Sequence, residues 1–175
     1  MASFYAIALL SMLAFSISAG HALDCEKLQT TLYIKQRYSQ DQRPVGTDTV
    51  AINWLINDGP DAAANTTGHA EGLTIHANLA KNFWVTIMDM VFESGSLAGS
   101  TLKVMGLHGA MNGGPGQWSV MGGTGELTMA RGIINYKIIQ EDSAGRTFEI
   151  YIYVFYTRKE TIVVSTRCFF ISWCY

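Results

Sequence analysis

The amino-acid sequence predicts an all-β fold, an eight-stranded antiparallel β-barrel. Apolar residues alternate with polar ones or run in short blocks, whereas a helix would repeat them every three or four positions. Clusters of Gly, Pro, Asn, Asp and Ser separate these segments and are typical of turns. Several strands with short links indicate an antiparallel barrel or sandwich, and we favour the barrel because closure removes the exposed edges of an open sheet.

The expected strands follow one another with clear turn chemistry between them. They cover residues 31–38, 49–56, 68–75, 82–92, 100–105, 118–122, 126–137 and 147–157. Arg43-Pro44-Val45-Gly46 separates the first two strands, and a turn at 57–61 separates the second from the third. A turn at 93–96 follows the fourth strand, and Glu141-Asp142-Ser143-Ala144-Gly145 connects the last two.

The alternation also predicts which side chains share a face. In the first strand Gln36 lies on the same face as Leu32, Ile34 and Tyr38, so it is a polar group among apolar ones. The fourth strand is apolar on both faces, with Phe83, Val85, Ile87 and Val91 on one and Trp84, Met88, Met90 and Phe92 on the other. Such a strand needs two buried surfaces, of which one is a subunit interface or a ligand-filled interior.

A glycine-rich segment, residues 109–125, holds seven glycines in 17 residues. It lacks the Gly-Lys-Ser/Thr of a phosphate loop, and it lacks the final glycine and the βαβ context of a dinucleotide-binding turn. The sequence therefore argues against nucleotide binding. It favours a tight hairpin or bulge, in which glycine allows positive φ and close approach of strands.

The composition and the start of the chain indicate a secreted protein. The chain has 175 residues, of which 15% are charged, and a net charge of -2, which argues against nucleic-acid binding. Residues 1–22 contain no Lys, Arg, Asp or Glu, and their apolar run precedes small residues, as in a secretory signal peptide cleaved after Ala22. Because that run is shorter than the roughly 20 residues that span a bilayer, a membrane anchor is the weaker alternative.

One domain, residues 23–157, is expected to follow the signal peptide, and residues 158–175 form an atypical tail. The cysteines are Cys25, Cys168 and Cys174. A bridge from Cys25 to either of the others would tie the two ends of the chain together, and three unpaired thiols are an equal alternative. No cysteine and histidine spacing of a zinc site is present, so no metal is expected.

The glycine-rich segment and three further stretches resemble the plant dirigent proteins. Trp118-Ser119-Val120-Met121-Gly122-Gly123-Thr124-Gly125-Glu126, followed by Met129-Ala130-Arg131-Gly132, is similar to the signature of that family. Gly59-Pro60-Asp61, Gly68-His69-Ala70-Glu71-Gly72 and the stretch 99–106 occur in the expected order. These motifs are most similar to the grass dirigent domains that precede a jacalin-type lectin domain, which is absent from this sequence.

The resemblance implies a trimeric barrel in the apoplast, the space of the plant cell wall, with a pocket at one barrel mouth. Dirigent proteins bind phenoxy radicals of monolignols such as coniferyl alcohol and direct their coupling to optically active lignans. A separate oxidase supplies the radicals, so the resemblance implies neither a cofactor nor an independent catalytic activity. Two alternatives stay open: a cyclase-like enzyme acting on quinone methide intermediates, and a non-catalytic, defence-related binding module.

The resemblance also assigns the cation of the signature, Arg131, to the pocket. Arg131 shares its expected strand parity with Leu127 and Met129, and a cation on an apolar face needs a carboxylate partner or a ligand. Glu126 occupies the acidic position of the motif. We expect either that a bulge turns the Glu126 side chain into the pocket or that this side chain faces solvent.

Other candidate positions depart from the lignan-forming members of the family. Lys35-Gln36 replaces a His-Asp pair, and an amide such as Gln36 forms hydrogen bonds but transfers no proton. Thr74 and His76 replace two tyrosines, and His76 either faces solvent or carries a proton near neutral pH. We expect substrate binding by Gln36 and Thr74, and acid–base chemistry by Arg131, His76 and Glu126. Asn65-Thr66-Thr67 is a sequon, so Asn65 is expected to carry an N-glycan.

Overall fold

The structure, a computed structural model, describes residues 25–38, 43–44, 49–78, 83–109 and 114–158. The expected signal peptide, 1–22, and nearly all of the expected tail lie outside these residues. No helix within the described ranges is long and apolar enough to cross a membrane.

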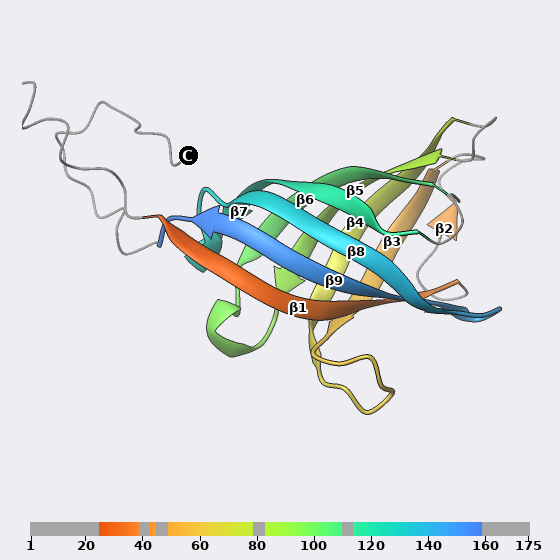
Figure 1. Cartoon of the computed structure of the whole chain (residues 1–175), viewed down its shortest axis with the longest axis horizontal. Helices are drawn as coiled ribbons and strands as arrows, with labels where there is room; N and C mark the ends of the chain where they lie inside the picture. The colour runs from red at the N-terminus through yellow and green to blue at the C-terminus, as the bar shows by residue number, and fades with distance from the viewer. Residues whose placement is uncertain (1–24, 39–42, 45–48, 79–82, 110–113, 159–175) are drawn as a thin grey trace, which may run out of the picture.

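Within the described residues, nine strands form one antiparallel sheet, which closes on itself (Figure 1). The strands are β1 Glu26–Arg37, β2 Arg43–Pro44, β3 Thr49–Asn57, β4 Thr66–Asn78, β5 Phe83–Phe92, β6 Thr101–Gly109, β7 Gly116–Thr124, β8 Arg131–Glu141 and β9 Gly145–Tyr156. Their order is β1-β9-β8-β7-β6-β5-β4-β3-β2, and pairing of β1 with β3 closes the barrel. The short β2 only extends the edge of β3, so the eight long strands confirm the expected eight-stranded antiparallel barrel.

The expected strand 126–137 begins too early. Residues Gly125–Leu127 form a 3₁₀ turn, η2, and the strand starts only at Arg131. Gly125 has a φ of 67° and Met129 a φ of 58°, and both values are incompatible with a continuous strand. The Thr128 hydroxyl donates to the Gly125 carbonyl at 2.6 Å and closes this turn. A second difference is small: Arg43 and Pro44, expected in a turn, pair with Ala51 and Val50.

Side chains alternate between the interior and the outer surface, as the sequence pattern predicts. Ile34 on β1, Met90 on β5 and Ile150 on β9 are fully buried inside the barrel, and Gln36 lies on the same inward face with 7% exposure. Ile87, on the other face of β5, is 44% exposed. The interior is filled mainly by Ile34, Ile52, Trp54, Ile56, Ala70, Met88, Met90, Phe92, Leu102, Val104, Trp118, Val120, Ile134, Tyr136, Phe148, Ile150, Ile152 and Val154.

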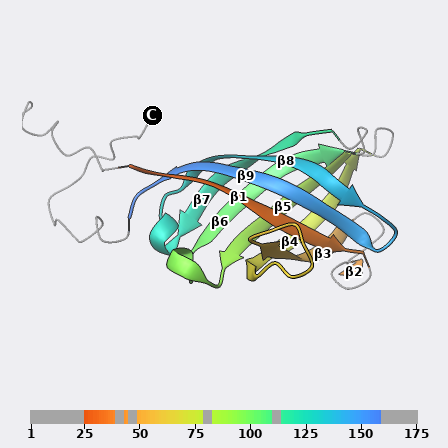
Figure 2. The same cartoon turned by 60° about the horizontal axis from the view of Figure 1, so that its bottom comes forward.

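The two ends of the barrel differ (Figure 2). We call the end where β1 finishes and β9 begins the mouth, and it carries Gln36 and Arg146. The opposite end, the base, carries Glu26 and Tyr156 together with η2 and a second 3₁₀ turn, η1 Gly95–Leu97. Cys25, which precedes β1 at the base, is disulfide-bonded. The other cysteines of the sequence lie outside the described residues.

Candidate functional site

Four aromatic side chains from four strands meet inside the barrel. Trp118 stacks on Tyr136 with ring centroids 4.3 Å apart, and Phe148 lies 5.9 Å from Tyr136 and 6.0 Å from Trp54. Glycine makes room for this cluster: a Cβ on Gly116 would lie 2.2 Å from the Tyr136 hydroxyl. The rings thus fill the interior with aromatic surface, and Trp54, Trp118 and Phe148 are each 1% exposed.

The aromatic cluster also contains polar groups. Nε1 of Trp54 and Nε1 of Trp118 are buried, and neither has a hydrogen-bond partner among the described residues. Buried donors are normally paired, so these two indole N–H groups are exceptions to that rule. Burial raises the pKa of Tyr136, whose phenol therefore stays protonated.

Polar side chains line the inner wall towards the mouth. Gln36, Thr74 and Thr86 are buried, and the Thr86 hydroxyl lies 3.4 Å from that of Thr74. His76 stacks on Trp84 with centroids 4.4 Å apart and planes only 3° from parallel. The structure thus places the expected residues Gln36, Thr74 and His76 in the same half of the barrel.

A β-bulge adds charged groups to the rim of the mouth. On β8, Ile138 pairs with Phe148 but Gln140 pairs with Thr147, so one residue is skipped and Glu141 comes opposite Arg146. Arg146 Nη2 lies 3.1 Å from Glu141 Oε1, and Arg146 Nε donates to the Tyr38 hydroxyl at 2.7 Å. That hydroxyl donates to Glu141 at 2.9 Å. Burial raises the pKa of Tyr38. Arg146 lowers this pKa and Glu141 raises it, both to a smaller extent than burial does.

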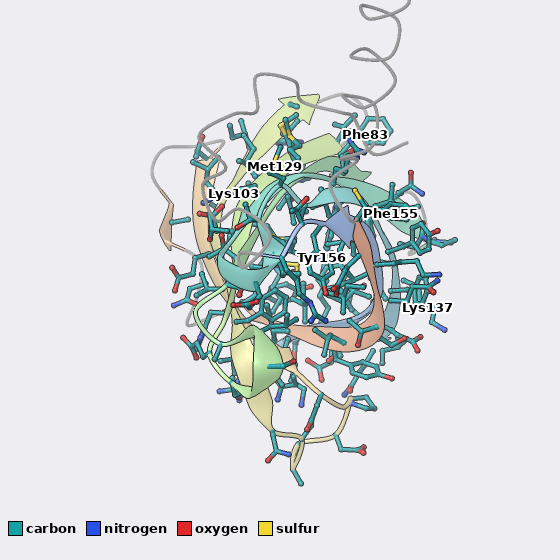
Figure 3. All side chains as sticks on the ribbon, turned by 90° about the vertical axis from the view of Figure 1, so that its left-hand side faces the viewer. Phe83, Lys103, Met129, Lys137, Phe155 and Tyr156 are labelled. Atoms are coloured by element: carbon teal, nitrogen blue, oxygen red, sulfur yellow. The ribbon has the colours of Figure 1, made fainter. Side chains whose placement is uncertain are left out.

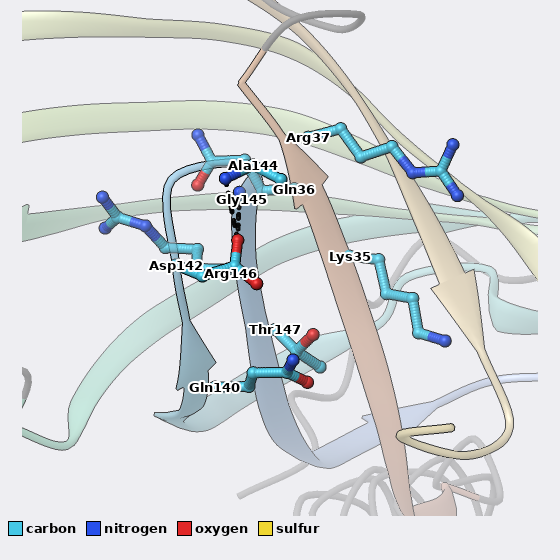
Figure 4. Close-up of a pocket in the computed structure, with 9 residues that line it drawn as sticks. All are labelled: Lys35, Gln36, Arg37, Gln140, Asp142, Ala144, Gly145, Arg146 and Thr147. Atoms are coloured by element: carbon cyan, nitrogen blue, oxygen red, sulfur yellow. Dashed lines mark hydrogen bonds between the residues drawn. The ribbon is translucent and has the colours of Figure 1, made fainter. Parts of the chain in front are cut away.

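An open cleft of about 370 Å³ lies beside this rim (Figure 4). It is lined by Lys35, Gln36, Arg37, Gln140, Asp142, Ala144, Gly145, Arg146 and Thr147. In Figure 4, Lys35 and Arg37 point to the opposite side of β1 from Gln36 and Arg146. The cleft therefore combines the inner and the outer edge of the barrel wall at the mouth.

Two of the expected catalytic residues lie at the base instead. Arg131 pairs with Phe155, whereas Gln36 pairs with Arg146 on the same strand, and the steps between these two β9 residues span about 30 Å. Glu126 belongs to η2, where its backbone N–H donates to the Ser100 hydroxyl at 3.0 Å. The structure does not bring Arg131 or Glu126 together with His76.

The surroundings of Arg131 also differ from the expected apolar strand face. Leu127 is fully buried in η2, while Met129 is 52% exposed in the turn that follows (Figure 3). The shared parity of these residues with Arg131 is therefore wrong. Arg131 Nη2 is buried and has no hydrogen-bond partner within the described ranges.

The expected glycosylation residue, Asn65, lies on the exposed loop between β3 and β4. Its Nδ2 donates to Asp58 Oδ2 at 2.9 Å, and its backbone N–H donates to Asp58 Oδ1 at the same distance. A glycan on Nδ2 would have to be accommodated beside this carboxylate. The glycan stays a prediction.

Sequence reasoning missed the rim residues Tyr38, Glu141 and Arg146. Glu141 was expected in a turn, because a bulge leaves no clear signal in the alternation. Arg146 has a signal: two-residue steps from it lead to Phe148 and Ile150, so it continues an apolar row with a cation. Among the described residues, no group of three or more His, Cys, Asp or Glu side chains is placed to hold a metal ion.

Comparison with known proteins gives one family and two similar curated proteins. A family model described as a dirigent-like protein matches residues 21–155. The chain is 28% identical over 104 residues to pterocarpan synthase 1 of Glycine max, and 27% identical over the same length to pterocarpan synthase 1 of Glycyrrhiza echinata. These matches cover 59% of this chain and 55% of each relative, so the chain spans about half the length of the curated relatives it matches.

Solved structures share the fold. The pterocarpan synthase dirigent protein GePTS1 superposes with a TM-score of 0.74 at 20% identity, covering 79% of this chain and 94% of that one. The pterocarpan synthase dirigent protein PsPTS1 gives a TM-score of 0.69 at 22% identity, covering 76% of this chain and 97% of that one.

Proposed function

Because the chain belongs to the dirigent-like protein family, we propose that it binds phenoxy radicals of monolignols and directs the stereochemistry of their coupling. The family implies a small phenolic ligand, and coniferyl alcohol is the radical precursor we propose. The protein would act without a cofactor and without oxidising the phenol, which a separate oxidase converts to the radical. The product is an optically active lignan.

The cleft at the mouth is the observation that carries this proposal. Its volume is about 370 Å³, and Gln36 and Arg146 line it with groups that form hydrogen bonds. Selective coupling needs two radicals held in a fixed relative orientation. Gln36 and Thr74, which are both buried, supply further hydrogen bonds near the mouth.

A second candidate function is ring closure of a quinone methide. It is favoured by the similarity to relatives that are named pterocarpan synthases and by the titratable groups at the mouth, among which are His76, Tyr38 and Glu141. Such a closure moves one proton from the attacking hydroxyl to the quinone methide oxygen, with no net oxidation. Arg131 and Glu126, placed at the base, would have to act without His76.

The product of radical coupling tests the proposal. Coniferyl alcohol is oxidised by a one-electron oxidant with and without the protein, and the lignans are separated by chiral chromatography. We expect one enantiomer in excess only with the protein, and loss of the excess in Gln36→Leu. Gln117→Leu, the same change at an exposed position of β7, is the matched control and should retain the excess. Racemic products with the unmodified protein would overturn stereocontrol.

We also propose that the protein is a secreted homotrimer with an N-glycan on Asn65. Support for self-association comes from the outer surface of β5 and β6, where Ile87 pairs with Met105 and Val85 with Leu107. The exposures of Ile87, Met105 and Leu107 are 44%, 40% and 60%. Ile87→Glu should turn the trimer into a monomer in light scattering, and an unmodified protein that is already monomeric would refute the trimer. Glycosidase treatment of plant-expressed protein should increase its gel mobility.

A further inference from the structure

Arg146 interrupts an otherwise apolar row on the inward face of β9. The residues at two-residue steps from it, Phe148, Ile150 and Ile152, are all at most 1% exposed. Arg146 stands at the mouth end of this row, opposite Gln36 on β1 and Glu141 on β8. A cation therefore lies where the aromatic interior meets the rim.

The neighbours of Arg146 hold its guanidinium in one orientation. Its Nε donates to the Tyr38 hydroxyl at 2.7 Å, and its Nη2 lies 3.1 Å from Glu141 Oε1. The guanidinium carbon lies 5.4 Å from the centre of the Tyr38 ring and 5.9 Å from that of Phe148. A guanidinium has five N–H donors, so these contacts leave donors available to a ligand oxygen. A group ordered in advance binds at a lower entropic cost.

The other charged groups near the mouth are less suited than Arg146 to binding a ligand oxygen. Lys35 and Arg37 point away from it, on the other side of β1 (Figure 4). The Asp142 carboxylate accepts the backbone N–H groups of Ala144 at 2.8 Å and Gly145 at 3.1 Å, so the hairpin itself engages it. Glu141 is 47% exposed and neutralises Arg146 only in part, because solvent screens the pair.

We propose that Arg146 anchors the oxygen of the phenolic ligand, preferring an anionic oxygen, while the ligand ring lies in the open cleft beside the rim. Tyr38 and Glu141 are positioning residues, which fix the guanidinium without touching the ligand. The inference rests on the proposed function, since it names the residue that orients the phenol. It also supplies a polar contact at a mouth where Gln36 replaces a carboxylate.

Ionisation of a bound chromophoric phenol tests this role. The probe is 4-nitrophenol, whose absorption spectrum distinguishes phenol from phenolate. We expect the full protein to bind the phenolate about tenfold more tightly than the phenol, which lowers the pKa of the bound probe by about one unit. Arg146→Gln should remove this shift, whereas Lys103→Gln, a cation lost from the outer surface of β6, should leave it. An unchanged shift in Arg146→Gln would overturn the proposal.

Two further measurements keep the outcome clear. Glu141→Gln removes the negative charge beside the guanidinium, so it should enlarge the shift, and an equal or smaller shift would count against the proposal even if Arg146→Gln does not fold. Binding of 4-nitroanisole, which has no ionisable oxygen, tests binding of the ring in the cleft separately. A protein that binds 4-nitroanisole but does not shift 4-nitrophenol refutes the role of Arg146 alone. A protein that binds neither refutes the proposed function as well.

Discussion

The base and the mouth of the barrel use polar residues in opposite ways. At the base, the Ser100 hydroxyl accepts the Glu126 N–H and the Thr157 N–H donates to the Thr128 carbonyl, so side chain and backbone together close local turns. At the mouth, Arg146 contacts the side chains of Tyr38 and Glu141, and its remaining N–H donors are available to a ligand. The C-terminal part of the most recognisable motif, residues 122–132, therefore builds the base, whereas the proposed ligand chemistry belongs to the mouth.

The largest expected effect is on the base. Gly123→Ala places a Cβ 2.2 Å from the Leu127 carbonyl oxygen, and no flexible side chain is there to yield. We expect a loss of roughly 2 to 4 kcal/mol in the free energy of unfolding, measured with urea. Gly122→Ala is the matched control, because its nearest neighbour would be Lys103 Cγ at 3.6 Å, an ordinary contact. Equal stabilities of the two variants would contradict the structural role of this glycine motif at the base.

A smaller loss is expected from the buried hydroxyl at the base. Ser100→Ala leaves the backbone N–H of Glu126 without its acceptor, which should cost about 1 to 2 kcal/mol. The melting temperature should fall while binding of 4-nitroanisole at the mouth is retained. Ser119→Ala, on the exposed face of β7, should change neither quantity. Weaker ligand binding by folded Ser100→Ala would show that the two ends are coupled.

The variant Arg131→Leu tests whether a residue at the base takes part in directed coupling. Because Arg131 is at the base and its Nη2 has no hydrogen-bond partner among the described residues, we expect a change within about 1 kcal/mol in stability. Directed coupling should persist. Loss of the enantiomeric excess in a stable variant would restore the pocket role that the family resemblance assigns to this residue.

The smallest effect is the dependence of stability on high pH. Burial is the first cause of the raised pKa values of Tyr38 and Tyr136, near the mouth, and of Tyr156, at the base. The folded protein holds these protons more tightly than the unfolded chain, so this stabilisation is complete below about pH 10 and is lost as the pH rises through the raised values. Urea titrations above pH 9 should show a shallower decline in Tyr136→Phe than in Tyr156→Phe, because Tyr136 is the more buried. An identical decline would contradict this order.

The sequence predicts the barrel well because burial in a strand is encoded two residues at a time. Ile34, Gln36 and Met90 all face inward as their alternation indicates. The start of β8 was wrong, because the positive φ of Met129 ends the alternation without a visible change in composition. The alternation also gave no sign that Arg131 and His76 lie at opposite ends of the barrel, because parity tells which side of the wall a residue faces and says nothing about its height along the barrel.

The contact between Glu141 and Arg146 was not predicted, because the bulge shifts the alternation of inward and outward side chains in β8 by one residue. The same pattern in a regular strand would have placed Gln140, a neutral side chain, opposite Arg146. Tyr38 was recognised on the inward face of the first strand, but its contact with Glu141 joins residues more than a hundred positions apart. Such contacts depend on the register of three strands, which a local pattern does not encode.

The bulge also bears on how related genes are compared and how they diverge. It accommodates one extra residue, Ile139, which is 42% exposed and skipped by the ladder with β9. Deleting its codon would restore a regular ladder and still leave Glu141 opposite Arg146. We therefore expect length differences of one codon to be tolerated at this point. A gap-free alignment with a relative that lacks the bulge would match Gln140, not Glu141, to the position that faces the arginine.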